Sequence, residues 1–231
     1  MPVCYTEWKV LPHKPIVVHS DRLWTVEGKM ENGTLRIMSM ARLDDGRVIL
    51  HNAIALDDEE MARLDAWGTV AGILVPNAFH RMDCRIMQLR YPGAKVYAPA
   101  GAAKAVAKAT PVHGSFADAP QDSTVRVSHL PGIKDQEGLI EVHEAGGVRL
   151  VFNDMIMNMK PMKFPIEWMI GPTGRMAVPR FARWWFASDK PALRKEFARL
   201  AELNPVGIVP GHGAIATENV TEQLRAAAAL I

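Results

Sequence analysis

Short apolar runs separated by turn residues predict a series of strands along the chain. Residues 36–43 alternate apolar and polar positions over part of their length, and Asp45-Gly46 separates them from a second run at 47–51. An Asp-Gly pair between two such runs is typical of a β-hairpin. Residues 70–75 are nearly continuously apolar, which indicates a strand buried on both faces. Further strands are expected at 23–26, 95–98, 124–130, 139–144, 148–152 and 206–209.

Apolar positions three and four residues apart predict helices between these strands. Four acidic residues at 57–60 precede Met61, Leu64 and Trp67, a pattern typical of the start of a helix. Other helices are expected at about 86–89, 101–109, 181–187, 191–203 and 217–231, the last with Thr217 as N-cap. The Met- and Trp-rich residues 155–185 are expected to form an irregular cover, either over a pocket or as core.

The order of these elements predicts one α/β domain over residues 1–231, because hairpins come first and strand–helix units follow. The net charge is only +2, and Lys and Arg are spread along the chain, so no nucleic-acid partner is expected. Two cysteines form no disulfide framework. No apolar run could span a bilayer, and residues 1–14 lack a signal-peptide core, so a cytoplasmic protein without membrane association is expected.

The ends of three predicted strands carry side chains that bind metal ions in many proteins. His80 follows the strand at 70–75 in the loop PNAFH, Asp154 follows the strand at 148–152, and His212 lies in the turn PGHG after 206–209. Imidazole and carboxylate groups are typical ligands of Zn, Fe and Mn. The intervals between the three residues are long, so their spacing alone does not bring them together. The alternative is that each makes an ordinary hydrogen bond to the backbone.

The order of these features resembles the metallo-β-lactamase fold superfamily from about residue 23 to the end of the chain. The stretches that carry the resemblance are LWTVEG, LDDGRVILHN, AGILVPNAFHRMDCRIMQLRYPGAKVYAPA, SHLPGI, RLVFNDMI and GIVPGHG. The resemblance implies a four-layer αββα sandwich of two mixed β-sheets flanked by helices, with the site at one edge of the sheets.

The metal-binding motifs of that family match this chain in part. The family motif H-x-H-x-D-H falls on residues 75–80, its H-T-P-G-H on SHLPGI, its bridging aspartate in RLVFNDMI and its last histidine in GIVPGHG. In one half of the two-metal site, the three histidines fall on Val75, Asn77 and Ile133. The other half keeps His80, Asp154 and His212, and its remaining aspartate falls on Phe79. The chain is thus similar to a branch in which a P-N-x-x-H loop replaces the full motif.

The retained residues imply a reduced site with one divalent metal ion, Zn, Fe or Mn. A catalytic zinc commonly has three protein ligands and a water, whose pKa the metal lowers to about 7. Asp154 and Asn77 are expected to be catalytic, with Asn77 adding a neutral oxygen or orienting that water. Asp83 is expected to accept a hydrogen bond from His80, because metal-bound histidines usually have such a partner.

Two functions stay open at this stage. The protein is a metal-dependent hydrolase acting on an ester, thioester, phosphoester or lactam, or it is a non-catalytic protein whose pocket binds a small molecule or partner without metal. In the second case the triad is a purely structural hydrogen-bonded cluster. His51 either lines the site or ends a strand in solvent. Three arginines of the 155–185 segment either meet an anionic substrate or face solvent: Arg175, Arg180 and Arg183. The apolar Met/Trp surface is compatible with a dimer.

Overall fold

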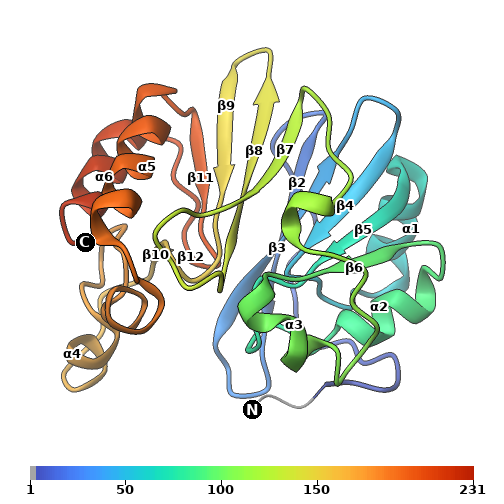
Figure 1. The fold of residues 1–231 in the computed structure, drawn as a ribbon. Coiled ribbons are helices and arrows are strands. Elements are labelled where there is room, and N and C mark those ends of the chain that lie inside the picture. Colours follow the sequence, from blue (N-terminus) through green and yellow to red (C-terminus); the bar gives the residue numbers. More distant parts are fainter. Residues whose placement is uncertain (1–3) are drawn as a thin grey trace.

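Two β-sheets packed face to face form the centre of the protein, in a computed structural model that describes residues 4–231 (Figure 1). The first sheet has the strand order β1 (Val17–Val18), β2 (Leu23–Lys29), β3 (Leu35–Arg42), β4 (Arg47–His51), β5 (Thr69–Leu74) and β6 (Lys95–Tyr97). Neighbouring strands are antiparallel from β1 to β4 and parallel from β4 to β6. The first sheet is therefore mixed, as expected.

The second sheet is also mixed. Its order is β11 (Gly207–Val209), β9 (Gly147–Val151), β8 (Gly138–Glu144) and β7 (Val125–His129). β11 runs parallel to β9, and the other neighbours are antiparallel. A separate parallel pair joins β10 (Met157–Asn158) to β12 (His212–Gly213) at the lower end of this sheet (Figure 1).

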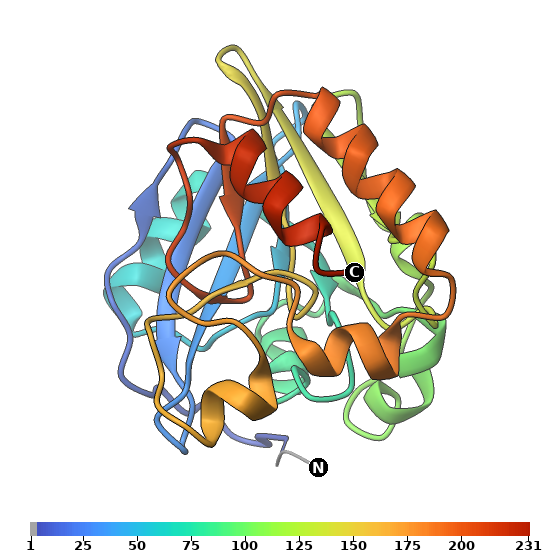
Figure 2. The ribbon, with the colours of Figure 1, turned by 90° about the vertical axis from the view of Figure 1, so that its left-hand side faces the viewer.

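Helices cover the outer face of each sheet. α1 (Asp58–Trp67), α2 (Cys84–Arg90) and α3 (Ala100–Val106) lie on the first sheet, and α5 (Lys190–Glu202) and α6 (Val220–Ala228) lie on the second (Figures 1 and 2). The short α4 (Ile166–Ile170) lies below the second sheet, in a segment that leaves the layers. The result is the four-layer αββα sandwich that the sequence predicts. Residues 1–3, which the single-domain prediction includes, lie outside the described residues.

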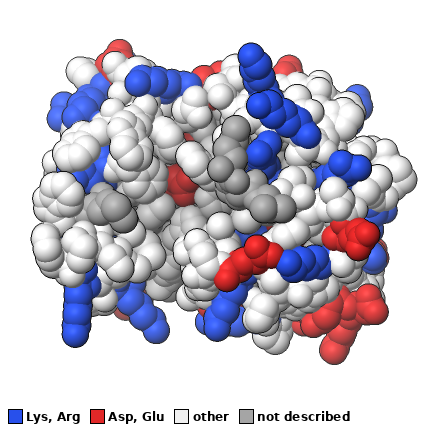
Figure 3. Space-filling model, turned by 90° about the horizontal axis from the view of Figure 1, so that it is seen from below, with Lys and Arg blue, Asp and Glu red and all other residues white. Residues whose placement is uncertain are grey.

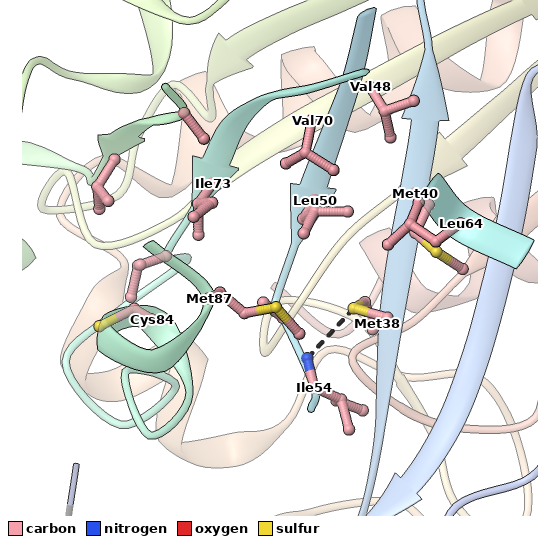
Figure 4. Packing of buried hydrophobic residues seen from close by; sticks show 14 of the residues in the cluster. Met38, Met40, Val48, Leu50, Ile54, Leu64, Val70, Ile73, Cys84 and Met87 are labelled. Atoms are coloured by element: carbon pink, nitrogen blue, oxygen red, sulfur yellow. Dashed lines mark hydrogen bonds between the residues drawn. The ribbon is translucent and has the colours of Figure 1, made fainter. Parts of the chain in front are cut away.

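Three apolar cores separate the four layers. The inner faces of the sheets meet in a core that includes Leu23, Ile49 and Ile140. A second core lies between the four-stranded sheet and its helices, and a third between the six-stranded sheet and α1 to α3. In the third core, shown in Figure 4, Leu50 is paired with Met40 on the neighbouring strand, and the sulfur of Met38 accepts a hydrogen bond of 3.2 Å from the Ile54 amide. These cores fix the strand ends that carry the polar residues.

Most predicted elements are confirmed, but the chain around the last helix differs from the prediction. Thr217 is not an N-cap: α6 begins at Val220, after Asn219 in a left-handed conformation (φ 46°). The physical reason is that Ala216 still pairs with Ile208 of β11, which holds the chain extended. The sequence also gave no indication of β1, β10, β12, α4 or the 3-10 helix at Phe116–Asp118. The helix predicted near 181–187 is a π-helical turn, Ala182–Phe186.

Candidate metal centre

The structure brings His80, Asp154 and His212 together at one edge of the two sheets. Nε2 of His80 lies 3.2 Å from Oδ1 of Asp154, and Nε2 of His212 lies 3.3 Å from the same oxygen. The two Nε2 atoms are 3.4 Å apart. All three side chains are buried. Within residues 4–231 no other group of three or more His, Cys, Asp and Glu side chains converges in this way.

The hydrogen bonds of the second ring nitrogens determine what the two histidines present to this triad. Nδ1 of His80 lies 3.0 Å from Oδ1 of Asn52, and the Asn52 amide donates to the Ile37 carbonyl at 2.9 Å, so the Asn52 oxygen faces His80. Nδ1 of His212 lies 2.6 Å from the Leu35 carbonyl oxygen. Both partners can only accept, so both Nδ1 atoms carry a proton, and the Nε2 atom of each ring faces Asp154, with its lone pair available whenever that ring is neutral.

The Asp154 carboxylate is oriented from its other side. Its Oδ2 accepts a hydrogen bond of 2.7 Å from the side-chain amide of Asn77, which leaves Oδ1 facing the two histidines. The Asn77 oxygen accepts from the backbone amide of Phe79 at 2.8 Å and faces the loop. Asn77 therefore contacts the triad through its NH₂ group, which does not match the alternative that it adds a neutral oxygen, and its catalytic role stays a prediction.

Three lone-pair atoms thus converge with separations of 3.2 to 3.4 Å. Neutral imidazoles and a carboxylate repel one another in this arrangement unless a cation or a proton lies between them. Ligand atoms about 2.0–2.1 Å from a tetrahedral zinc ion are themselves about 3.3 Å apart. The residues present therefore fit a divalent metal ion in both donor chemistry and spacing.

The pKa values of the three buried side chains of the triad shift in different directions. Burial raises the pKa of Asp154, but the two histidines lower it more, so the net pKa lies well below its usual range. Burial lowers the pKa of His80, which favours its neutral form. Burial also lowers the pKa of His212, but its hydrogen bond with Asp154 and the charge of Asp154 raise it above the usual value. In the absence of a metal ion, Asp154 thus favours the doubly protonated, positively charged form of His212, whose Nε2–H can donate to Asp154.

Comparisons with known proteins agree with this architecture. The solved structure of the DIM-1 metallo-β-lactamase matches with a TM-score of 0.63 at 10% identity, over 95% of this chain and 99% of that chain. The metallo-β-lactamase FIM-1 from Pseudomonas aeruginosa, solved in its mono-zinc form, matches with a TM-score of 0.60 at 17% identity, over 96% and 97%. A metallo-β-lactamase from Hirschia baltica matches with a TM-score of 0.57 at 13% identity, over 93% and 98%.

The chain has the metallo-β-lactamase fold. No family model and no curated protein matches the sequence. The likeness therefore establishes the fold, and the chemistry of the site has to be argued from its own residues.

One further prediction is wrong, and one of the two alternatives for His51 is excluded. Asp83 does not contact His80: its carboxylate forms a buried ion pair with Arg36 and accepts from the Ala55 amide at 3.1 Å. Asn52 takes the position expected for Asp83. His51 is not a strand end in solvent but is buried, its Nε2 lacks a hydrogen-bond partner, and burial followed by the nearby His80 lowers its pKa to about 3.

Glu137 is a positioning residue that the sequence did not reveal. Its buried carboxylate accepts from the backbone amides of Asn153 at 2.7 Å and Met155 at 3.0 Å, and so fixes the turn that carries Asp154. Burial, and then the charge of Asp154, raises its pKa. Sixteen residues separate Glu137 from Asn153, so no local motif indicates this contact.

Of the three positions matched to the missing half of the family motif, only Asn77 contacts the triad. Val75 packs in the core under α1 to α3, and Ile133 packs in the core of the second sheet. Phe79 instead lines the cavity at the triad, as expected for a neighbour of His80. The three arginines of the 155–185 segment do not line this cavity: Arg175 and Arg180 line a groove beside Trp168, and Arg183 donates to the Leu230 carbonyl. No helix in the described part of the chain is long and apolar enough to cross a membrane.

Proposed function

We propose that the protein is a metal-dependent hydrolase with one divalent metal ion, Zn, Fe or Mn, held by His80, Asp154 and His212. The observation that carries this proposal is that the Nε2 atoms of both histidines converge on one oxygen of Asp154. The remaining polar atoms of the three side chains already have hydrogen-bond partners in Asn52, the Leu35 carbonyl and Asn77. A metal ion in this position supplies Lewis acidity and lowers the pKa of a bound water.

The chain's own residues provide the other requirements of a hydrolytic site. Asn52 and the Leu35 carbonyl keep the two imidazoles in the tautomer that binds metal, and Asn77 keeps Asp154 Oδ1 directed at them. The loop residue Phe79 and the π-helical turn 182–186 place apolar groups over the triad, which limits the access of bulk water.

A single metal ion is favoured over two. Within residues 4–231 the triad is the one cluster of candidate ligands, and Val75 and Ile133 are packed in cores away from the cavity. Three protein ligands is the number that catalytic zinc sites commonly have. The single domain, the small-molecule partner and the cytoplasmic location stay predictions from the sequence, which is also compatible with a dimer.

The proposal is tested by loading metal-free protein with Zn²⁺, Mn²⁺ or Fe²⁺ and assaying ester, thioester, phosphoester and lactam substrates. Asp154→Asn should lower kcat/KM at least about 100-fold, because the substitution removes the only carboxylate of the triad. Asp58→Asn, at the exposed start of α1, removes the same charge far from the site and should have no effect. Equal activity in Asp154→Asn and the unaltered protein would contradict the proposal.

One observation favours a second, non-catalytic function. A single proton on His212 satisfies the triad without metal, because His212 then donates to Asp154. In that case the cavity binds a small molecule or partner and the cluster is structural. Absence of bound metal after incubation with each of the three ions would favour this function.

A further inference from the structure

A cavity of about 410 Å³ opens over the triad, and its walls are mainly apolar. His80, Asp154 and His212 form one side. The other lining residues come from several parts of the chain, and four of those parts supply bulky apolar side chains: Met30, Phe79, Met157, Phe181, Trp185 and Phe186. The ring of Phe181 packs against those of Trp185 and Phe186, with centroids 6.4 and 5.8 Å apart. Figure 3 shows the lower face of the molecule, where white surface predominates on the left-hand part, with blue groups along its edges and a few charged groups further in.

Two aromatic side chains of the cavity wall are largely exposed to solvent. Phe79 is 55% exposed and Trp185 is 67% exposed, although both rings border a buried carboxylate. Aromatic side chains with an open face gain free energy when an apolar ligand covers them. The cavity is therefore shaped for an apolar group placed next to the triad.

The charges around the cavity argue against an anionic group at this position. Among the described residues that line it, none is Lys or Arg, and Asp154 brings a negative charge. The guanidinium of Arg36 lies behind the histidines, but it is buried and paired with Asp83. Lys14 and Lys160 line a neighbouring groove that shares Asn32 and Thr34 with the cavity, and Lys14 is paired with Glu27 at 2.7 Å. A phosphoester or a lactam carboxylate would meet no cationic side chain in the described cavity lining, so a metal ion at the triad, already partly neutralised by Asp154, would be its one positive partner.

We propose that this cavity binds uncharged carboxylic esters or thioesters that carry a bulky aromatic or branched apolar group. The inference rests on the proposed hydrolase and selects among its four substrate classes. Hydrolysis adds one water across the ester: the water oxygen bonds to the carbonyl carbon, the carbon–oxygen or carbon–sulfur bond breaks with its electron pair on the leaving atom, and that atom takes a proton from water. The products are a carboxylic acid and an alcohol or thiol.

Binding to the metal-free protein tests the inference independently of catalysis. The probes are N-(2-naphthyl)acetamide, an uncharged and stable analogue of an aryl ester, and 2-naphthyl phosphate, which has the same ring and a dianionic group. We expect the acetamide to bind at least about tenfold more tightly in calorimetric titrations. Trp185→Ala should weaken its binding about tenfold, because the ring loses its largest aromatic contact.

The neighbouring Trp184→Ala is the matched control, because Trp184 is similarly exposed, at 60%, and does not line the cavity. Phe79→Lys should reverse the preference toward the phosphate by adding the missing cation. If the metal-free protein binds the acetamide selectively but the metal-loaded protein hydrolyses none of the assayed substrates, the inference about the cavity is upheld and the proposed hydrolase is contradicted. Tighter or equal binding of the phosphate, or equal effects of Trp185→Ala and Trp184→Ala, would overturn the inference even if the loaded protein hydrolyses another substrate.

Discussion

Asn52 and His80 are joined by a hydrogen bond of 3.0 Å between two buried side chains. Asn52 follows the last residue of β4 and has a left-handed backbone (φ 55°), whereas His80 lies in the loop after β5. The contact links two neighbouring strand ends and places the proton of His80 on Nδ1. As a result the Nε2 atom that faces Asp154 is free to bind a metal ion.

Replacing Asn52 by glycine should weaken metal binding about 10- to 100-fold, as loss of a histidine's hydrogen-bond partner typically does. Glycine adopts a positive φ without strain. The substitution therefore removes the side-chain oxygen that His80 contacts and leaves the backbone conformation unchanged. Asn52→Asp retains an acceptor oxygen and should restore most of the affinity. Competition with a chelator of known affinity measures these differences.

Asn204→Gly is the control for the Asn52 experiment, because Asn204 also has a left-handed backbone (φ 47°) but makes only an exposed contact outside the site. It should leave metal affinity unchanged. If Asn52→Gly behaves as Asn204→Gly does, Asn52 has no part in orienting His80.

Metal affinity should fall as the pH is lowered. In the metal-free protein, burial lowers the pKa of His212, but Asp154 raises it more, so the net value lies above 6.5. A metal ion must displace that proton, so below the raised pKa the affinity should decrease about tenfold per pH unit.

Protonation of His212 also stabilises the metal-free fold. Its contribution to the free energy of unfolding is full below pH 6.5 and is lost as the pH rises through the folded-state pKa of His212. Imidazole NMR signals and binding titrations measured from pH 5.5 to 8.5 check both signs. A flat affinity over this range would show that His212 is not a ligand.

The buried ion pair between Arg36 and Asp83 should be costly to break from one side. Asp83→Ala leaves a buried guanidinium without its partner, so the free energy of unfolding should decrease by about 3–5 kcal/mol. Asp65→Asn, which breaks the partly exposed pair with Arg90, should cost less than about 1 kcal/mol. Urea denaturation measures both. Because Arg36→Met combined with Asp83→Leu removes both charges, the double variant should be more stable than Asp83→Ala, and the reverse order would contradict this account.

The sequence predicted most strands and helices because their signals are local, whereas their arrangement in four layers was implied by the family resemblance. The Asp45-Gly46 turn, with Gly46 at φ 84°, joins β3 to β4 as expected. Asp57 caps α1 by accepting from the Glu60 amide, and the continuous apolar run at 70–75 is β5. Each of these features depends on residues within a few positions of one another.

The environment of the site could not be predicted in the same way, because its contacts join distant segments. Asp83 was the expected partner of His80, but tertiary packing pairs Asp83 with Arg36, and Asn52, which no local signal indicated, takes its place. Glu137 reaches the turn of Asp154 only because β8 and β9 pair. The residues His80, Asp154 and His212 were found because each follows a predicted strand, and strand ends gather at one edge of a sheet.

The central claim, that the triad holds one metal ion, is tested most directly by elemental analysis of protein purified without a metal-affinity tag. The account predicts about one equivalent of Zn, Fe or Mn per chain, lost in both His80→Ala and His212→Ala. His129→Ala, on a histidine that pairs with Asp135 outside the triad, should retain the metal. Absence of metal from the unaltered protein, even after incubation with Zn²⁺, Mn²⁺ or Fe²⁺, would contradict the claim and leave the triad as a hydrogen-bonded cluster.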